Sequence, residues 1–397
     1  MTDDYQPMVL DRCVISTHFE ITPEVITDRV LFNQKHSTDI LDNDPRSRQV
    51  AGQNQKSQKL VFSSYGGIVV FTDEVSNGRW FANRIHFNPR NVLFRHNGHR
   101  ICIDDFTIAL TILREQVSKI LKRPADIIHI VPGLHPHSNS FWSTLEITVD
   151  LADPDGQLEE RVFKNPHHPK MKESFRHREG TVQIGSPDGP CKIRFYRKDK
   201  QMQKLLRKHR IAGAPRVFRI ELVLSQGKLL EHLGSANNSR IIEGTNRLVR
   251  FSPADLIECF LRIVTRLQGC YRVVDAGAVK GAKMDKTSRF MAWVATRYNI
   301  PLVELLDLYE TQIGCSDETM GRQRRAAYSM MARISPVRFE EIFSTANLQR
   351  QPSIVIPELE ATVAYRRQYV MGALDIEMNY GQPLPFPLRY ESAQKIL

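Results

Sequence analysis

The chain has 397 residues, of which 41% are hydrophobic and 25% charged, and these fractions exclude a fibrous or disordered protein. Its net charge of +11 favours a polyanionic partner, and nucleic acid is the commonest one. We expect no membrane partner and a cytoplasmic location, because no apolar run reaches the ~20 residues of a membrane span and no signal-peptide pattern opens the chain. The six scattered cysteines form no Cys-x-x-Cys pair, which indicates free thiols in a reducing compartment.

The first elements in the chain are strands with one long helix among them. Strand patterns cover residues 11–21, 59–72 and 79–89, and the second is expected to break at Gly66-Gly67. Residues 42–59 are polar and predict a loop. Residues 104–123 place apolar side chains at helical spacing after two aspartates, which predicts a helix.

The middle of the chain returns to strands, at residues 126–131, 141–151, 192–199 and 216–225. Residues 152–182 predict an exposed loop, and residues 201–210 predict a basic helix. From residue 252 the patterns are helical, beginning at a Ser-Pro cap. The sequence therefore predicts an α+β domain with an antiparallel sheet over residues 1–245 and a mainly helical domain over residues 246–397.

The strand at 141–151 alternates in polarity. Leu145, Ile147 and Val149 share one face, while Glu146 and Asp150 share the other. Glu221 lies in another predicted strand and is flanked by apolar residues. If its carboxylate is buried, it needs a partner.

Four segments, in this order, resemble the replication initiators of filamentous bacteriophages, the gene II-type nicking–closing proteins with their plasmid and prophage relatives. They are NPRNVLFRHNGHR (88–100), STLEITVDL (143–151), IGSPDGPCKIRFYRKDKQ (184–201), and RVFRIELVL (216–224) followed by KLLEHLG (228–234). The chain departs from the family pattern at five positions. Asn91, Phe94 and Arg95 replace the expected Lys, Gln and Gly, Glu146 stands where an Asp is commoner, and Gln201 stands where a Glu usually follows.

The resemblance implies an HUH-like nicking domain that starts rolling-circle replication. Such a protein nicks origin DNA through a tyrosine, forms a 5′-phosphotyrosine link with a free 3′-OH, and later rejoins the strand. Its partners would be single-stranded or supercoiled origin DNA and the host's helicase and polymerase, in the cytoplasm of a bacterial host. Its cofactor would be a divalent metal ion, Mg²⁺ or Mn²⁺.

Tyr196 is the candidate nucleophile and Lys198 a candidate for steadying the phosphate or the departing oxygen. Nine Lys or Arg residues and a single acid share residues 192–210, surroundings that favour a phenolate and bind a phosphate backbone. The alternative is a strand tyrosine beside a solvated basic helix. The residues expected to bind DNA are Lys192, Arg194, Arg197, Lys200, Lys204, Arg207, Lys208 and Arg219.

Glu146, Asp150 and Glu221 are the candidate metal ligands, since oxygen donors suit a hard divalent cation. The alternative is that these acids pair with Arg194 or Arg219, or meet water.

Other polar groups offer rival assignments. His135 and His137 form a His-x-His pair, although Pro136 argues against a central strand there. Tyr365 and Tyr369 lie one helical turn apart, as in two-tyrosine initiators, but a packed helix face explains them equally. His167, His168 and His177 are expected in a solvated loop, and His96 with Asn97 is expected to cap or orient the helix that begins near Asp104.

Two other functions remain open at this point. One is a non-catalytic DNA-binding protein for replication or copy control, which keeps the basic surface without cleavage. The other is an RNA-binding protein with a similar sheet.

Overall fold

The structure is a computed structural model of the whole chain. It describes residues 7–22, 24–25, 60–63, 68–75, 79–121, 130–133, 139–154, 156, 158–163, 166–171, 174–176, 180–234, 240–242, 247–268, 270, 290–291, 294, 302–314, 316–334, 337–357 and 359.

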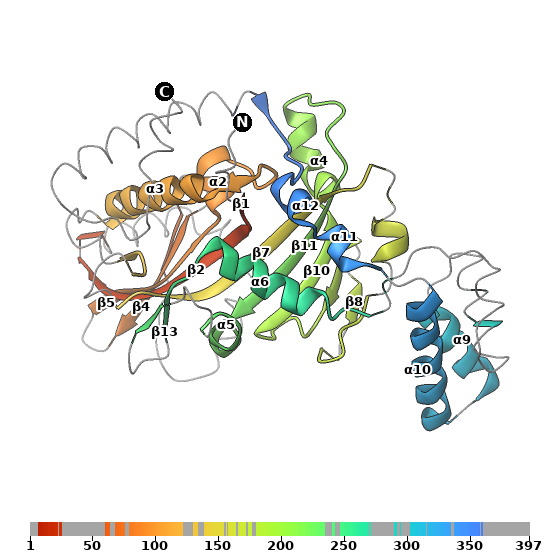
Figure 1. Ribbon diagram of the computed structural model, residues 1–397. Helices are drawn as coiled ribbons and strands as arrows, with labels where there is room; N and C mark the ends of the chain where they lie inside the picture. Colours follow the sequence, from red (N-terminus) through yellow and green to blue (C-terminus); the bar gives the residue numbers. More distant parts are fainter. Residues whose placement is uncertain are drawn as a thin grey trace. The chain divides into compact units, whose positions relative to one another are not determined.

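Within this described part, nine strands form one sheet in the order β3-β4-β5-β2-β7-β11-β10-β9-β8 (Figure 1). The strands are β2 (Leu10–Ile21), β3 (Leu60–Ser63), β4 (Val69–Val75), β5 (Arg79–Phe87), β7 (Phe141–Ala152), β8 (Ser174–Arg176), β9 (Val182–Ile184), β10 (Cys191–Arg197) and β11 (Val217–Ser225). Antiparallel registers join β3 to β4, β4 to β5, β5 to β2, β11 to β10, β10 to β9 and β9 to β8. The expected α+β class with an antiparallel sheet is confirmed.

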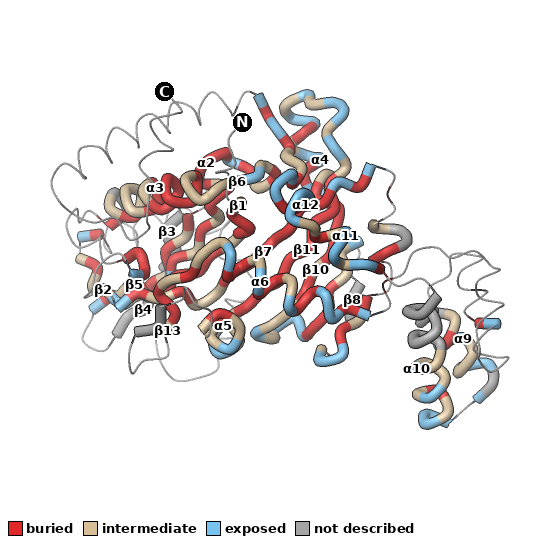
Figure 2. The backbone as a smooth tube through the Cα atoms, viewed as in Figure 1, coloured by how far each residue is buried: buried red, intermediate tan, exposed pale blue. Residues whose placement is uncertain are grey.

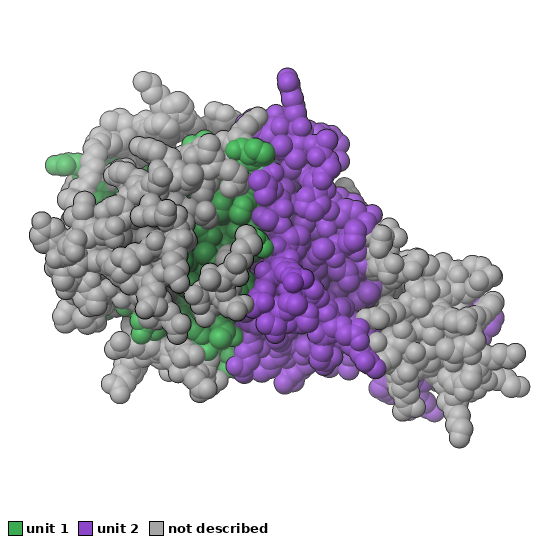
Figure 3. Space-filling model, turned by 45° about the horizontal axis from the view of Figure 1, so that its top comes forward, with its two compact units in different colours: residues 1–146, 225–256, 356–397 green, residues 147–224, 257–355 purple. Residues whose placement is uncertain are grey.

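The chain divides into two compact units, coloured separately in Figure 3. Unit 1 consists of residues 1–146, 225–256 and 356–397, and unit 2 consists of residues 147–224 and 257–355. The domain boundary expected at residue 245 stays a prediction.

In unit 1, the core forms around Trp142, whose ring lies 5.3 Å from that of Phe251 and 6.3 Å from that of Phe106. The Trp142 indole nitrogen donates to the Val249 carbonyl at 3.2 Å, so this large side chain is buried with its polar atom satisfied. Phe106 belongs to α3 (Ile103–Leu121), which packs beside the short helix α2 (Pro89–Phe94). The helix expected from residue 104 is confirmed.

Unit 1 also holds five further elements in its described part. These are β1 (Pro7–Met8), which pairs with β6 (Ile101–Cys102), the β12–β13 hairpin (Arg240–Ile242 and Arg247–Arg250), and α5 (Gln226–Leu233).

In unit 2, three stacked phenylalanines form the core beneath β10 and β11. The Phe163 ring lies 5.3 Å from both Phe195 and Phe218. Phe163 follows a π-helical turn at Leu158–Val162, and β8 (Ser174–Arg176) and β9 (Val182–Ile184) continue the sheet. The exposed loop expected over residues 152–182 is therefore wrong in part, because buried aromatic packing and strand pairing order portions of it.

The sheet is buried along both faces of its central strands (Figure 2). Every residue of β11 from Val217 to Leu224 is buried, as are Leu145 to Leu151 of β7. Alternation of polarity on β7 therefore does not mark a solvent face. Its polar residues lie inside the protein, where each must be paired.

The turn between β9 and β10 requires glycine. Gly185 has φ of +93°, and a Cβ there would come within 2.8 Å of the Cys191 carbonyl oxygen. The Lys192 ammonium donates to the Pro187 carbonyl at 2.6 Å, which ties the loop to the start of β10. The glycine of the third resembling segment thus sets the entry into the strand that carries Tyr196.

Helices make up most of the described chain after residue 252. Helix α6 begins after Ser252, whose hydroxyl accepts from the Asp255 amide at 3.1 Å while Asp255 accepts from the Ser252 amide at 2.8 Å, so the expected Ser-Pro cap is confirmed. The helices are α6 (Pro253–Val264), α9 (Leu302–Ile313), α10 (Asp317–Ile334), α11 (Phe339–Ile342) and α12 (Thr345–Gln349). None of the helices in the described ranges has the length and apolarity to cross a membrane.

Candidate metal centre and nucleophile

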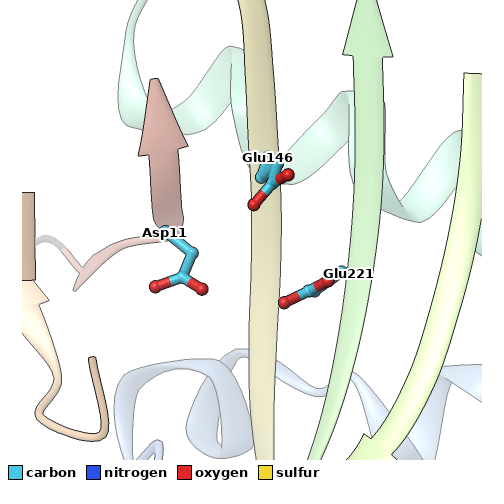
Figure 4. Close-up of side chains that lie close together, drawn as sticks. All are labelled: Asp11, Glu146 and Glu221. Carbon is cyan, nitrogen blue, oxygen red and sulfur yellow. The ribbon is translucent and has the colours of Figure 1, made fainter. Parts of the chain in front are cut away.

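Among the described residues, three buried carboxylates from neighbouring strands come together. Asp11 lies on β2, Glu146 on β7 and Glu221 on β11, and each offers an oxygen within 4.8 Å of the others. Figure 4 shows their carboxylates pointing toward one another. All three are at most 7% exposed. Two of them, Glu146 and Glu221, are expected metal ligands.

Asp11 is held by amides from the first resembling segment. Asn88 donates to its Oδ1 at 2.8 Å and Asn97 to its Oδ2 at 3.3 Å. Asn88 also caps α2 by accepting from the Asn91 amide at 3.1 Å. The buried Arg90 donates to the Leu10 carbonyl at 3.2 Å, directly before Asp11. This segment therefore positions a carboxylate, and Asn97 acts on Asp11 rather than only on the helix that follows.

Glu146 has an arginine beside it. The Arg12 guanidinium is 3.6 Å from Glu146 Oε1, and its other terminal nitrogen lies 3.0 Å from His86 Nδ1. His86 in turn contacts the Phe71 ring at 4.5 Å between centroids. Arg12 is thus oriented on both sides while about a third of its side chain stays exposed.

Tyr196 meets the third carboxylate directly. Its hydroxyl donates to Glu221 Oε1, and it is buried on β10 opposite Arg219 in the antiparallel register. Arg194, two residues earlier, lies with a terminal nitrogen 3.5 Å from Glu221 Oε2 and donates to the Gln183 side chain at 3.1 Å. The phenol, the acid and a guanidinium therefore meet at one place on the β10–β11 pair.

Lys198 follows the tyrosine but not on the same strand. The strand ends at Arg197 and α4 (Lys198–Lys208) begins at Lys198, so the expectation that this lysine continues the strand is wrong. Its side chain is fully buried, donates to Gln201 Oε1 at 2.7 Å, and places Nζ 5.8 Å from the centre of the Tyr196 ring. Gln201 thus receives a hydrogen bond where the phage family usually has a glutamate.

The three carboxylates suit a hard divalent cation. Oxygen donors in a buried cluster are what Mg²⁺ and Mn²⁺ prefer, and like charges this close repel one another unless protons or a cation intervene. The negative charge of these acids also affects the neighbouring Cys13 thiol. Its pKa is raised well above the ordinary value by burial first, and then by Glu146 and Asp11. The residues present therefore fit a metal ion.

Asp150 stands in a separate, closed pair. Arg219 donates to both of its oxygens at 2.6 Å, and both side chains are at most 1% exposed. The Asp150 amide also donates to Gln351 Oε1 at 3.1 Å. Asp150 shares this fork with Arg219 instead of joining the three-carboxylate cluster, and Arg219 lies in the core rather than on a surface.

The basic residues of β10 and α4 fall into two groups. Arg197 is buried and pairs with Asp199 and with Glu159 at 3.2 Å, and Lys200 also reaches Glu159 at 3.0 Å. Hydrogen bonding to Asp199 raises the pKa of Arg197. Lys200, in contrast, is exposed, and three further basic residues of α4, Lys204, Arg207 and Lys208, lie exposed beyond it.

Of the candidate histidines, the structure describes His96, His167 and His168, and the solvated loop expected for His168 is wrong because its side chain is buried. His167 pairs through its backbone and its ring with Gln268, at 2.9 Å between the ring nitrogen and the amide oxygen. Burial lowers the pKa of His167 and of His168. His96 accepts from the Gly98 amide at 3.2 Å. His135, His137 and His177, together with Tyr365 and Tyr369, lie outside the described residues.

Asp11 is the site residue that sequence reasoning missed. It begins a strand whose next polar residues are Arg12 and Ser16, so nothing in local polarity distinguishes it from a solvated strand end. What marks Asp11 is its contact with residues that are distant in the sequence, and no local pattern shows such a contact. The asparagines at 88 and 97 fold back to an acid about 80 residues earlier, as their sequence separations of 77 and 86 record.

No protein-family model and no curated protein matches this chain. Among solved structures, the chain is similar to a rolling circle replication initiator protein from Geobacillus stearothermophilus. That likeness has 12% identity and a TM-score of 0.25, and it covers 63% of this chain and 95% of the other.

Proposed function

We propose that this chain is a metal-dependent DNA-nicking and strand-transfer enzyme that initiates rolling-circle replication, as the gene II-type initiators that it resembles do. The nicking domain of the HUH type would occupy residues 1–245, followed by a helical domain over residues 246–397. Its substrate would be single-stranded or supercoiled origin DNA, and host helicase and polymerase would extend the free end in the bacterial cytoplasm.

One observation carries the proposal. The Tyr196 hydroxyl donates to Glu221, and Glu221 is one of three buried carboxylates whose oxygens lie within 4.8 Å of one another. Phosphoryl transfer to tyrosine needs a hydroxyl whose proton an acid can accept, and a nearby cation that polarises the phosphate. The hydrogen bond from Tyr196 to Glu221 and the three carboxylates supply the groups for both.

The proposed reaction has two reversible halves. The Tyr196 oxygen attacks phosphorus while the phenolic proton passes to Glu221, and the bond from phosphorus to the 3′-oxygen breaks. The departing 3′-oxygen takes a proton from water and becomes the free 3′-OH, Glu221 returns its proton to solvent, and the 5′-phosphate stays on the tyrosine. A later 3′-OH attacks the same phosphorus, releases Tyr196, and rejoins the strand, so the energy of the bond is retained throughout.

Side chains around the tyrosine divide the remaining tasks. Asp11, Glu146 and Glu221 would hold Mg²⁺ or Mn²⁺, which when bound neutralises charge on the scissile phosphate. Arg194 and Arg12, each beside one of these acids, would meet the phosphate oxygens. The Lys198 ammonium, 5.8 Å from the ring centre, would favour the phenolate.

DNA binding would follow the exposed basic side of α4. Lys204, Arg207 and Lys208 lie on the helix that begins two residues after Tyr196, so a strand bound there leads its backbone toward the nucleophile. Lys192 and Lys200 would extend the same surface, whereas Arg197 and Arg219 would support it from inside.

The test is a search for a covalent adduct. The full chain is incubated with Mn²⁺ and a pool of random-sequence single-stranded oligonucleotides, and products that survive denaturing electrophoresis are digested and mapped by mass spectrometry. The expected adduct is a nucleotide on Tyr196. Tyr196→Phe removes one hydroxyl and should abolish the adduct while DNA still binds, and Tyr309→Phe on α9 serves as the matched control that keeps it.

The outcomes separate the alternatives. An adduct on another tyrosine would overturn the role of Tyr196 and keep the reaction. Tight DNA binding without an adduct on any residue would leave the non-catalytic replication or copy-control protein as the function. Tighter binding of RNA than of DNA of the same sequence would favour the RNA-binding alternative.

A further inference from the structure

A second site lies in unit 1, at a cavity of about 510 Å³. It is bordered by β2, β5, the start of β7 and the start of β13, and the reaction proposed above uses none of its residues. Its volume falls in the range of small-molecule and cofactor sites.

The cavity has a flat cationic wall. The Arg247 guanidinium lies over the Phe141 ring at 4.9 Å from its centre, and both residues line the cavity and are only half-buried. A guanidinium is planar, and its attraction to the face of an aromatic ring holds it at the cavity. The pair therefore offers an aromatic surface and a positive charge at one point.

A second flat ring stands on β2. His18 is exposed and stacks on Phe81, with 4.4 Å between ring centres and 3° between ring planes. One face of the imidazole rests on Phe81, and the exposed remainder borders the cavity. The register between β2 and β5 shifts between Ser16 and Phe19, and a bulge of this kind redirects side chains out of the regular alternation.

The remaining lining residues are small and polar. Ser16 and Thr17 bring hydroxyls, and Asn83 and Asn139 bring amides. Thr17 is fixed by a hydrogen bond of 2.9 Å from the Ser140 hydroxyl. Amides and hydroxyls can each donate and accept, which suits the polar edge of a base.

We propose that this cavity binds an unpaired base of single-stranded DNA. The base would stack on the flat surfaces of both His18 and the Arg247–Phe141 pair, its edge would meet the asparagines, and Arg247 would attract the adjoining phosphate. Planar surfaces, polar edge groups and one cation together match a nucleotide, and bases stack on such surfaces with little regard to sequence. The inference rests on the proposed function only in taking DNA as the nucleic acid.

The experiment uses the full chain and a single-stranded oligodeoxynucleotide carrying 2-aminopurine, whose fluorescence falls when it stacks. Wild type should bind and quench the probe. Phe141→Leu and His18→Ala should each lose quenching and weaken binding by about 10- to 100-fold, the loss expected for one stacked base. Phe290→Leu, at a ring that is 62% exposed elsewhere, is the control that should bind as wild type does.

Charge is tested separately from stacking. Arg247→Gln and Arg322→Gln change the net charge equally, and Arg322 lies 72% exposed on α10. Only Arg247→Gln should reduce quenching. Circular dichroism and melting temperature establish that each variant is folded, and Phe141→Tyr keeps the ring and should retain binding if Phe141→Leu fails for lack of stacking.

Several results would overturn this inference. Wild-type quenching and affinity in both Phe141→Leu and His18→Ala would do so, even with a nucleotide adduct on Tyr196, in which case the proposed function stands without this site. A ribo-oligonucleotide bound tenfold more tightly than its deoxy counterpart would overturn the assignment to DNA. If the wild-type chain quenches the probe but forms no nucleotide adduct on Tyr196, the proposed function is contradicted and the base-binding site is still supported.

Discussion

Two groups of buried side chains on neighbouring strands of the sheet, an acid with its arginine and a cluster of three acids, have opposite surroundings. Asp150 of β7 and Arg219 of β11 form a two-pronged ion pair in which each charge meets its complement. Glu146 of β7 and Glu221 of β11 instead approach a third acid, Asp11, and each also lies 3.5–3.6 Å from a guanidinium nitrogen. A buried acid with a matched arginine is part of the framework, whereas acids gathered together mark a place where a cation or a proton is needed.

The largest expected effect comes from opening the closed pair. Asp150→Ala leaves Arg219 buried and without its carboxylate, so the free energy of unfolding should fall by about 3–5 kcal/mol in chemical denaturation. Asp188→Ala, at an exposed turn, should change it little. Replacing both partners, with Asp150→Leu and Arg219→Met, should recover most of the loss because no charge is left buried.

A loss of under 1 kcal/mol in Asp150→Ala would contradict the closed pair, since the arginine would then have found other partners. Asp150 would in that case be available for the metal, as its sequence position suggested.

The acidic cluster should respond to metal instead. Mn²⁺ at about 100 times its dissociation constant should stabilise the wild type by roughly 2.7 kcal/mol, because only the folded chain presents three converging carboxylates. Glu146→Gln removes one ligand and one repelling charge, so it should melt at or slightly above the wild-type temperature without metal and gain little when metal is added. Differential scanning calorimetry with and without Mn²⁺ measures both.

Glu340→Gln, an exposed acid on α11, is the control that should keep the full metal response. A Glu146→Gln protein that gains as much stability from Mn²⁺ as the wild type would remove the cluster from consideration as a metal site.

The comparison of the two groups also shows what the sequence could and could not predict. Strand and helix periodicity predicted β2, β5, β7, β10, β11 and α3, because each repeats its pattern over seven residues or more. The first and last residues of the helices and strands were harder to predict from the sequence. The start of α4 at Lys198 depends on Asp199, which accepts from the Val217 amide at 3.1 Å and from Arg197, partners set by tertiary structure.

Within the site, the types of residue were predictable and their partners were not. Glu146, Asp150 and Glu221 were equivalent as strand acids in apolar surroundings. Which of them meets an arginine and which meets another acid depends on strand order and register, which no local pattern encodes. Asp11 was missed for the same reason.

Asp199 tests an intermediate case, an acid paired with arginine near the surface. Burial by itself would raise its pKa, but hydrogen bonds from Arg197 and the Val217 amide outweigh burial and lower the pKa below its usual value. A lowered pKa in the folded chain contributes stability above the unfolded value of about 4, and that stability is lost as pH falls through the folded pKa. Asp199→Asn should therefore melt below wild type at pH 7, with the difference shrinking below about pH 4.

Measuring melting temperatures of both proteins from pH 7 to pH 3 checks this. A difference that stays constant, or grows as the solution becomes more acidic, would mean that the Arg197–Asp199 pair does not supply the stability.

The smallest effect is expected from the exposed cations of α4, where charge is spread over several side chains. Lys204→Gln should weaken single-stranded DNA binding a few-fold at low salt and reduce the slope of log affinity against log salt by about 0.7, the value for one phosphate contact. Lys200→Gln should do less, since its ammonium already pairs with Glu159 at 3.0 Å. Lys170→Gln removes the same charge from an exposed turn and should leave the slope unchanged.

If all three variants shift the slope equally, long-range attraction to the net charge of +11 explains binding, and α4 does not contact the phosphates specifically. A shift confined to Lys204→Gln would instead place a phosphate on the helix that starts beside Tyr196, where exposed cations rather than buried pairs face the DNA.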